Sequence, residues 1–135
     1  MSMKTFVRLT LAAAFLSQSV SAFTQEDGGG KRLYQSYCTG CHGSGGKGDG
    51  PAGKALPVKP ADHTNAKKMD QLTDDHLFTV IAKGGAASGK SSHMPAWGGV
   101  LKENQIQQII VYIRGLSRAV NHSEKGVPKD RQGGN

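Results

Sequence analysis

The feature that most constrains this chain is the pentapeptide Cys38-Thr39-Gly40-Cys41-His42. Residues three apart lie on one face of a helical turn, so both thiols can approach one edge of a planar group. Cys-x-x-Cys-His is the spacing at which a c-type haem is attached, through two thioethers to its vinyl groups. Attachment here would carry His42 beneath the iron, and imidazole is a common axial ligand. The pattern predicts one covalently bound haem c, held by Cys38 and Cys41, with His42 as a ligand of its iron.

Two other kinds of site use closely spaced cysteines. A thiol-disulfide redox pair belongs in a βαβ unit, but no strand-like run of β-branched residues surrounds this pair. A structural zinc site needs four Cys or His ligands, usually as two close pairs, and the sequence has no second close pair. Cys38 and Cys41 are the only cysteines of the chain, and they follow an export signal, which favours haem attachment.

Residues 1–22 have the three parts of a cleaved signal peptide. Lys4 and Arg8 form the positive part, residues 9–16 the apolar core, and residues 20–22 a small-residue cleavage site. The apolar core is much shorter than the roughly 20 residues that span a bilayer, so no transmembrane anchor is expected. The sequence therefore predicts export to the periplasm.

The charge and length of the remaining chain suit a small basic domain. Lysine and arginine (17) outnumber aspartate and glutamate (10), a formal charge of +7 that falls to +5 without Lys4 and Arg8. Such a surface suits docking on the acidic surfaces of redox proteins, and it equally suits simple solubility. Because the lysines form no stripe with interleaved aromatics, nucleic acid is not a predicted partner.

Three segments have helical patterns. The first covers about residues 31–41, and the second follows an N-cap at Thr73 and ends near Lys83. The third covers about residues 102–117, and beyond it residues 118–135 are predicted to be a polar, mobile tail. The apolar stripe of the third segment consists of Ile106, Ile109, Ile110, Ile113 and Leu116. With no strand predicted, the fold class is all-α.

This order of features resembles the class I c-type cytochromes. In that family a small residue stands eight positions before the first cysteine and an aromatic four before it, as Gly30 and Tyr34 do here. Tyr112 stands where the family places the aromatic that packs on the small residue. The resemblance covers residues 30–116 and implies a cytochrome c-like domain at 23–117, with three main helices around one haem and long irregular loops.

The resemblance also supplies a second ligand. The segment His93-Met94-Pro95-Ala96-Trp97 is similar to the family's distal segment, which implies that the thioether of Met94 binds iron opposite the proximal histidine. It implies that Trp97 packs on the haem edge or donates to a propionate. His93 is the main rival ligand. Met69 is a weaker rival, because its charged neighbours indicate a solvated loop.

Further expectations concern the loops. The family's post-motif loop implies that the carbonyl of Pro51 accepts a hydrogen bond from His42, and that Leu56 and Val58 cover one side of the haem. The glycines of residues 43–50 would let the backbone approach the haem closely, and they match no phosphate-binding fingerprint. The remaining histidines are expected to be solvated, and they are His63, His76 and His122.

Two protein ligands leave no open coordination position, so the resemblance implies a one-electron carrier rather than an enzyme. Its partners would be redox protein donors and acceptors. One alternative is the cytochrome subunit of an exported multi-subunit oxidoreductase, so a monomer and a complex both remain open. A less favoured alternative is a gas- or peroxide-binding protein, which would require that Met94 does not hold the sixth position.

Overall fold

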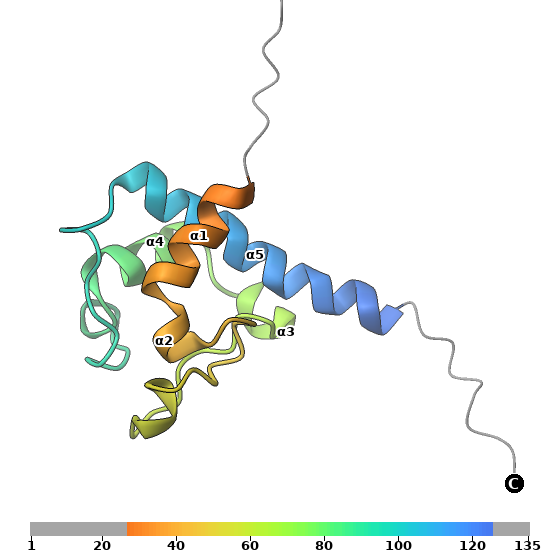
Figure 1. The fold of residues 1–135 in the computed structure, drawn as a ribbon, viewed down its shortest axis with the longest axis horizontal. Helices are drawn as coiled ribbons and strands as arrows, with labels where there is room; N and C mark the ends of the chain where they lie inside the picture. The colour runs from red at the N-terminus through yellow and green to blue at the C-terminus, as the bar shows by residue number, and fades with distance from the viewer. Residues whose placement is uncertain (1–26, 126–135) are drawn as a thin grey trace, which may run out of the picture.

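The computed structural model describes residues 27–125 (Figure 1). All regular secondary structure in this range is helical, and it contains no strand. The elements are α1 (Asp27–Tyr37), α2 (Thr39–His42), η1 (Gly53–Ala55), α3 (Ala66–Met69), α4 (Asp74–Lys83), η2 (Ala86–Ser88) and α5 (Glu103–Lys125). The all-α fold class is confirmed. The predicted signal peptide at 1–22 lies outside the described residues. No helix within 27–125 has the length and apolar character needed to cross a membrane.

Helices α1 and α5 cross in direct backbone contact at Gly30 (Figure 1). A Cβ atom there would lie 3.2 Å from Cβ of Tyr112 and would collide with the carbonyl oxygen of Gln108. One turn further along α1, the ring of Tyr34 packs on that of Tyr112, with centroids 5.1 Å apart. The expected contact between Gly30 and Tyr112 is therefore present.

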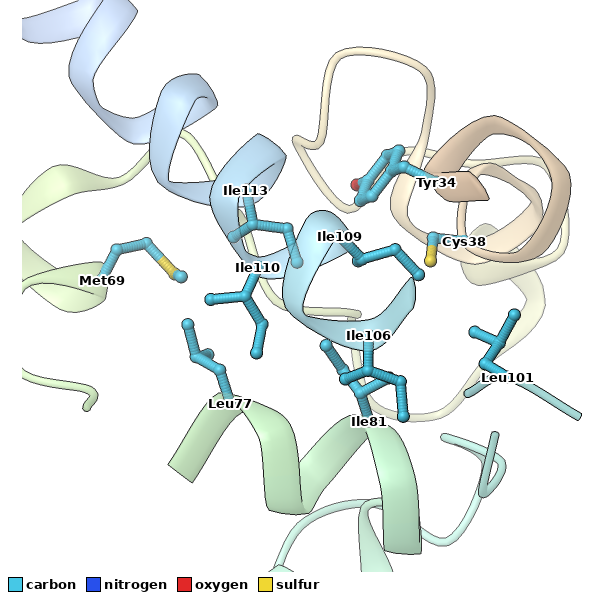
Figure 2. Packing of buried hydrophobic residues seen from close by; sticks show 10 residues of the cluster. All are labelled: Tyr34, Cys38, Met69, Leu77, Ile81, Leu101, Ile106, Ile109, Ile110 and Ile113. Atoms are coloured by element: carbon cyan, nitrogen blue, oxygen red, sulfur yellow. The ribbon is translucent and has the colours of Figure 1, made fainter. Parts of the chain in front are cut away.

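The apolar stripe of α5 forms the centre of the core. Figure 2 shows its isoleucines between Tyr34 and Cys38 on one side and Leu77 and Ile81 of α4 on the other. The apolar α5 residues that are at most 3% exposed are Ile106, Ile109, Ile110 and Ile113. One helix face thus joins α1 and α4, as its periodicity predicts.

Helix α4 begins and ends where its sequence predicts. The hydroxyl of Thr73 accepts a hydrogen bond of 3.1 Å from the backbone N–H of His76. Asp74 and Asp75 follow in the first turn, where the helix dipole favours carboxylates. The helix stops at Gly84, whose φ of +83° suits glycine.

Two helix boundaries differ from the prediction. The first helix begins at Asp27 and is interrupted at Cys38, whose φ of −113° separates α1 from α2. The last helix continues past Ser117 to Lys125. A helix extends until something interrupts it, and residues 118–125 contain neither glycine nor proline. The polar composition of residues 118–125 therefore does not end the helix at Ser117, and the rest of the predicted tail, residues 126–135, lies outside the described residues.

Met69 corrects a further expectation, because its side chain is only 2% exposed and belongs to the core. Helix α3 is amphipathic, with Lys67 and Lys68 outside and Met69 inside. Arg114 of α5 secures this segment by donating to the carbonyl oxygens of Met69 (2.6 Å) and Leu72 (2.5 Å). Charged neighbours in the sequence therefore marked one face of a short helix, not a solvated loop.

Candidate haem site

A cavity of about 490 Å³ opens beside α2 and is closed by residues 56–61, α4 and the loop before α5. This volume is typical of sites for small organic ligands. All four residues predicted to bind haem line the cavity: Cys38, Cys41, His42 and Met94. Most of the wall is apolar and consists of Leu56, Val58, Leu72, Leu77, Val80, Ile81 and Ile113. These walls and ligand types fit a porphyrin with two vinyl groups and a central iron.

Cys38 and Cys41 are not joined by a disulfide. Burial, and next the neighbouring Cys41, raises the pKa of the Cys38 thiol to about 12, so it is protonated at neutral pH. Within residues 27–125, no group of three or more His, Cys, Asp or Glu side chains is arranged to hold a metal ion.

His42 is held by the carbonyl oxygen of Ala61, which is 3.1 Å from its Nδ1. A carbonyl can only accept, so Nδ1 carries the proton and Nε2 keeps a lone pair for a metal. Burial lowers the pKa of His42, although the bond to Ala61 acts in the opposite direction. The site therefore holds the neutral imidazole that haem iron binds.

The acceptor is thus Ala61, and the expectation for Pro51 is wrong. The glycine-rich loop folds back on the backbone of the motif: the N–H of Gly48 donates to His42 O (2.8 Å) and that of Gly50 to Cys41 O (3.1 Å). A Cβ at Gly50 would lie 2.5 Å from carbonyl oxygens of α2. The loop supports the backbone of the motif, while the later segment at Ala61 passes beside the imidazole.

His63 is buried and not solvated, contrary to expectation. Its ring stacks on that of His42, with centroids 4.3 Å apart and planes 19° apart. Its Nδ1 lies 3.0 Å from the hydroxyl of Tyr34. Burial, and next the proximity of His42, lowers the pKa of His63 to about 3, so it is neutral at physiological pH. It lies in a loop without periodicity, so no sequence pattern marked it.

Met94 lies half-buried in a loop that is tied to the end of α4. Its carbonyl oxygen accepts a hydrogen bond from the N–H of Gly85 (3.0 Å), and its own N–H donates to Ser91 O (3.1 Å). Beyond it, the N–H of Trp97 donates to Ile81 O (2.9 Å). The Trp97 ring meets Tyr37 edge to face, with centroids 5.2 Å apart, at the cavity wall.

The rival ligands differ in their surroundings. His93 is exposed at the edge of the cavity, and its Nδ1 lies 3.2 Å from the hydroxyl of Ser91. Met69 lines the cavity from the buried face of α3. His76 also lines it and is half-buried rather than solvated. The side chain of His122 lies outside the described part of the chain.

Comparison with known proteins identifies the family. The sequence profile of the family described as cytochrome c oxidase, cbb3-type, subunit III matches residues 25–113. The match contains every residue that lines the cavity. No curated protein matches the chain. The chain therefore belongs to this family, and it is a class I c-type cytochrome whose cofactor is covalently bound haem c with its iron.

Proposed function

We propose that the domain carries single electrons on one haem that is bound through thioethers to Cys38 and Cys41, with His42 and Met94 as axial ligands. Haem-based electron transfer follows from the family, and the ligand set is our proposal. The observation that carries it is the convergence of all four side chains on one largely apolar cavity. Bound haem supplies a reversible one-electron couple. With both axial positions filled by the protein, no position is left for a substrate, so we propose a carrier and not an enzyme.

The chain's own residues tune the potential of this couple in three ways. A thioether is a soft, weak ligand, and His/Met ligation raises the potential relative to harder ligand pairs. The apolar wall excludes water, which disfavours the more highly charged ferric state. The hydrogen bond from His42 to Ala61 has the opposite tendency, because it makes the imidazole more basic.

We further propose that the domain works in the periplasm and meets its redox partners at the opening of the cavity. Residues 1–22 carry the sequence pattern of an export signal. Lys59 and Lys90 are exposed and both line the cavity. Positive charge there would attract acidic donors and acceptors and would make electron transfer slower at high salt.

The family supports a second candidate, a subunit of an oxidase complex. Its description names subunit III of a cbb3-type cytochrome c oxidase. Val58 and Val100 are 57% and 62% exposed, and such residues could contact other subunits. Co-purification of the tagged chain with haem-copper oxidase subunits from native membranes would support this role. Recovery as a free monomer from the soluble periplasmic fraction would contradict it.

The ligand set is tested on protein matured in a host that attaches c-type haem. We expect haem to remain on the chain in a denaturing gel. The ferric protein should show the weak long-wavelength band of methionine-iron ligation and should not respond to carbon monoxide when reduced. Met94→Leu should remove the band, whereas His93→Ala should retain it.

Met69→Leu is the matched control for Met94→Leu, because Met69 also lines the cavity and leucine conserves its volume. It should retain the band. Loss of the band in Met69→Leu but not in Met94→Leu would overturn the assignment of Met94. A wild-type protein without covalent haem would overturn the proposal as a whole, and strong carbon monoxide binding would favour the gas-binding alternative.

A further inference from the structure

His63 restricts the ring of His42 in a way that the hydrogen bond to Ala61 does not. A hydrogen bond at Nδ1 still tolerates some rotation of the imidazole about its Cβ–Cγ bond. The ring of His63 lies against the face of His42 at 4.3 Å, nearly parallel to it. His63 is 8% exposed and His42 is 9% exposed, so the stacked pair is buried, and His63 blocks rotation of His42 toward its side.

His63 is itself held in place by contacts of its backbone and of its side chain. Its backbone N–H donates to Gly46 O (2.6 Å), and its Nδ1 is 3.0 Å from the Tyr34 hydroxyl. A Cβ at Gly46 would lie 2.7 Å from Leu116 Cδ1 and 3.3 Å from Cβ of His63. The backbone of Gly46 therefore packs closely against this residue.

Tyr34 connects His63 to the helix crossing. Its side chain is fully buried, and its ring packs on Tyr112 of α5. Burial raises the pKa of Tyr34, so its hydroxyl keeps its proton and can donate to His63 Nδ1. A continuous set of contacts thus runs from α5 through Tyr34 and His63 to His42.

The position of His63 excludes it as the second iron ligand. Two axial ligands must approach the iron from opposite faces of the porphyrin. A ring stacked on His42 lies on the same face as His42. Any effect of His63 on the iron must therefore pass through the orientation of His42.

We infer that His63, held by Tyr34, is a positioning residue that sets the orientation of the His42 imidazole plane relative to the haem. The role of His63 rests on the proposed function, because it takes His42 as an iron ligand. The plane of an axial imidazole decides how unpaired electron density spreads over a ferric low-spin porphyrin. That distribution determines the order and spread of the haem methyl resonances in a proton NMR spectrum.

The test compares these methyl resonances in haem-loaded ferric variants. His63→Ala removes the stacked ring and should change both the order and the spread of the four resonances. His63→Phe keeps a flat ring without the bond to Tyr34, and Tyr34→Phe removes the hydroxyl alone, so both should give smaller shifts. Tyr112→Phe is the matched control, because Tyr112 contacts Tyr34 without bonding to His63, and it should leave the pattern unchanged.

Two readouts separate this inference from the proposed function. Haem retention in a denaturing gel and the methionine band report on attachment and ligation, and the methyl pattern reports on the ring plane. A wild-type pattern in His63→Ala would overturn the role of His63 while leaving the ligand set intact. If His63→Ala does not fold, unchanged patterns in both His63→Phe and Tyr34→Phe would overturn it. Loss of covalent haem from the wild type would overturn both.

Discussion

The backbone N–H of Gly85 donates a hydrogen bond of 3.0 Å to the carbonyl oxygen of Met94. The two segments pack closely around this bond. A Cβ at Gly85 would lie 3.0 Å from Cβ of Met94 and would collide with the carbonyl oxygen of Ser91. A Cβ at the preceding Gly84 would lie 3.0 Å from Met94 O. The end of α4 therefore holds the loop that carries the proposed distal ligand.

Gly85→Val should loosen the Met94 loop and weaken methionine ligation. The added side chain has no space against Ser91 and Met94, so the loop must move away from α4. We expect the methionine band of the ferric protein to lose at least half its intensity and the ferrous protein to bind carbon monoxide. Gly99→Ala is the control in the same loop, because a Cβ there meets nothing within 4 Å. A full methionine band in Gly85→Val would contradict this account.

Gly30→Ala should destabilise the crossing of α1 and α5. Its Cβ would overlap the backbone of Gln108, and overpacking of this kind costs about 1–3 kcal/mol. Gly28→Ala, two residues earlier in α1, meets no atom within 4 Å and should gain up to about 1 kcal/mol from helix propensity. Denaturant unfolding of the two haem-loaded variants measures the difference. Equal free energies of unfolding would show that the close contact is unimportant.

Arg114→Met should cost more stability than loss of its surface ion pair. The substitution leaves the carbonyl oxygens of Met69 and Leu72 without their donor, which costs about 2–4 kcal/mol. Asp74→Asn removes the charge that pairs with Arg114 and that favours the first turn of α4, but the Asp74 side chain is 63% exposed, so the cost should stay at about 1 kcal/mol. Thermal unfolding of both variants provides the comparison. A larger effect of Asp74→Asn would mean that the ion pair, not the carbonyl contacts, secures α3.

Asp62→Asn should reduce stability at neutral pH but not in acid. The Asp62 carboxylate accepts hydrogen bonds from the Thr64 hydroxyl (2.6 Å) and from the Thr64 backbone N–H (2.9 Å). The bond from the hydroxyl is the main cause that lowers the pKa of Asp62, and the bond from the N–H acts in the same direction. Because the pKa of Asp62 is lower in the folded than in the unfolded protein, its carboxylate stabilises the fold at pH values above the unfolded pKa of about 3.9. This contribution disappears as the pH falls through the folded pKa. Because Asp62 is partly exposed to solvent, we expect a difference of about 1 kcal/mol or less at neutral pH.

This direction of the pH dependence is tested by measuring the free energies of unfolding of the wild type and of Asp62→Asn from pH 7 into acid. The two curves should converge as the pH falls. Thr64→Val is the control, because it removes the hydroxyl donor and should shrink the pH-dependent difference. Curves that diverge as the pH falls would contradict a lowered pKa of Asp62 in the folded protein.

Local patterns in the sequence were sufficient for the three main helices, apart from their boundaries, and for the haem motif. The spacing of Cys38, Cys41 and His42 predicts their common placement because one helical turn brings them together. The N-cap at Thr73 predicts the start of α4, and the stripe of α5 predicts its buried face, because capping and periodicity act over a few residues. The resemblance to known cytochromes added Met94, which the structure places on the same cavity.

What surrounds His42 was decided only by the tertiary structure. Ala61 rather than Pro51 accepts from His42, and His63 stacks on it, because the chain returns past the imidazole after a long loop. Met69 enters the core for a similar reason, since Arg114 of α5 holds its segment in place. Loops have no periodicity that records which face is inside, so their contacts depend on distant segments. The sequence by itself thus determined the helices and the haem motif, while the packing of the loops determined how the motif is held.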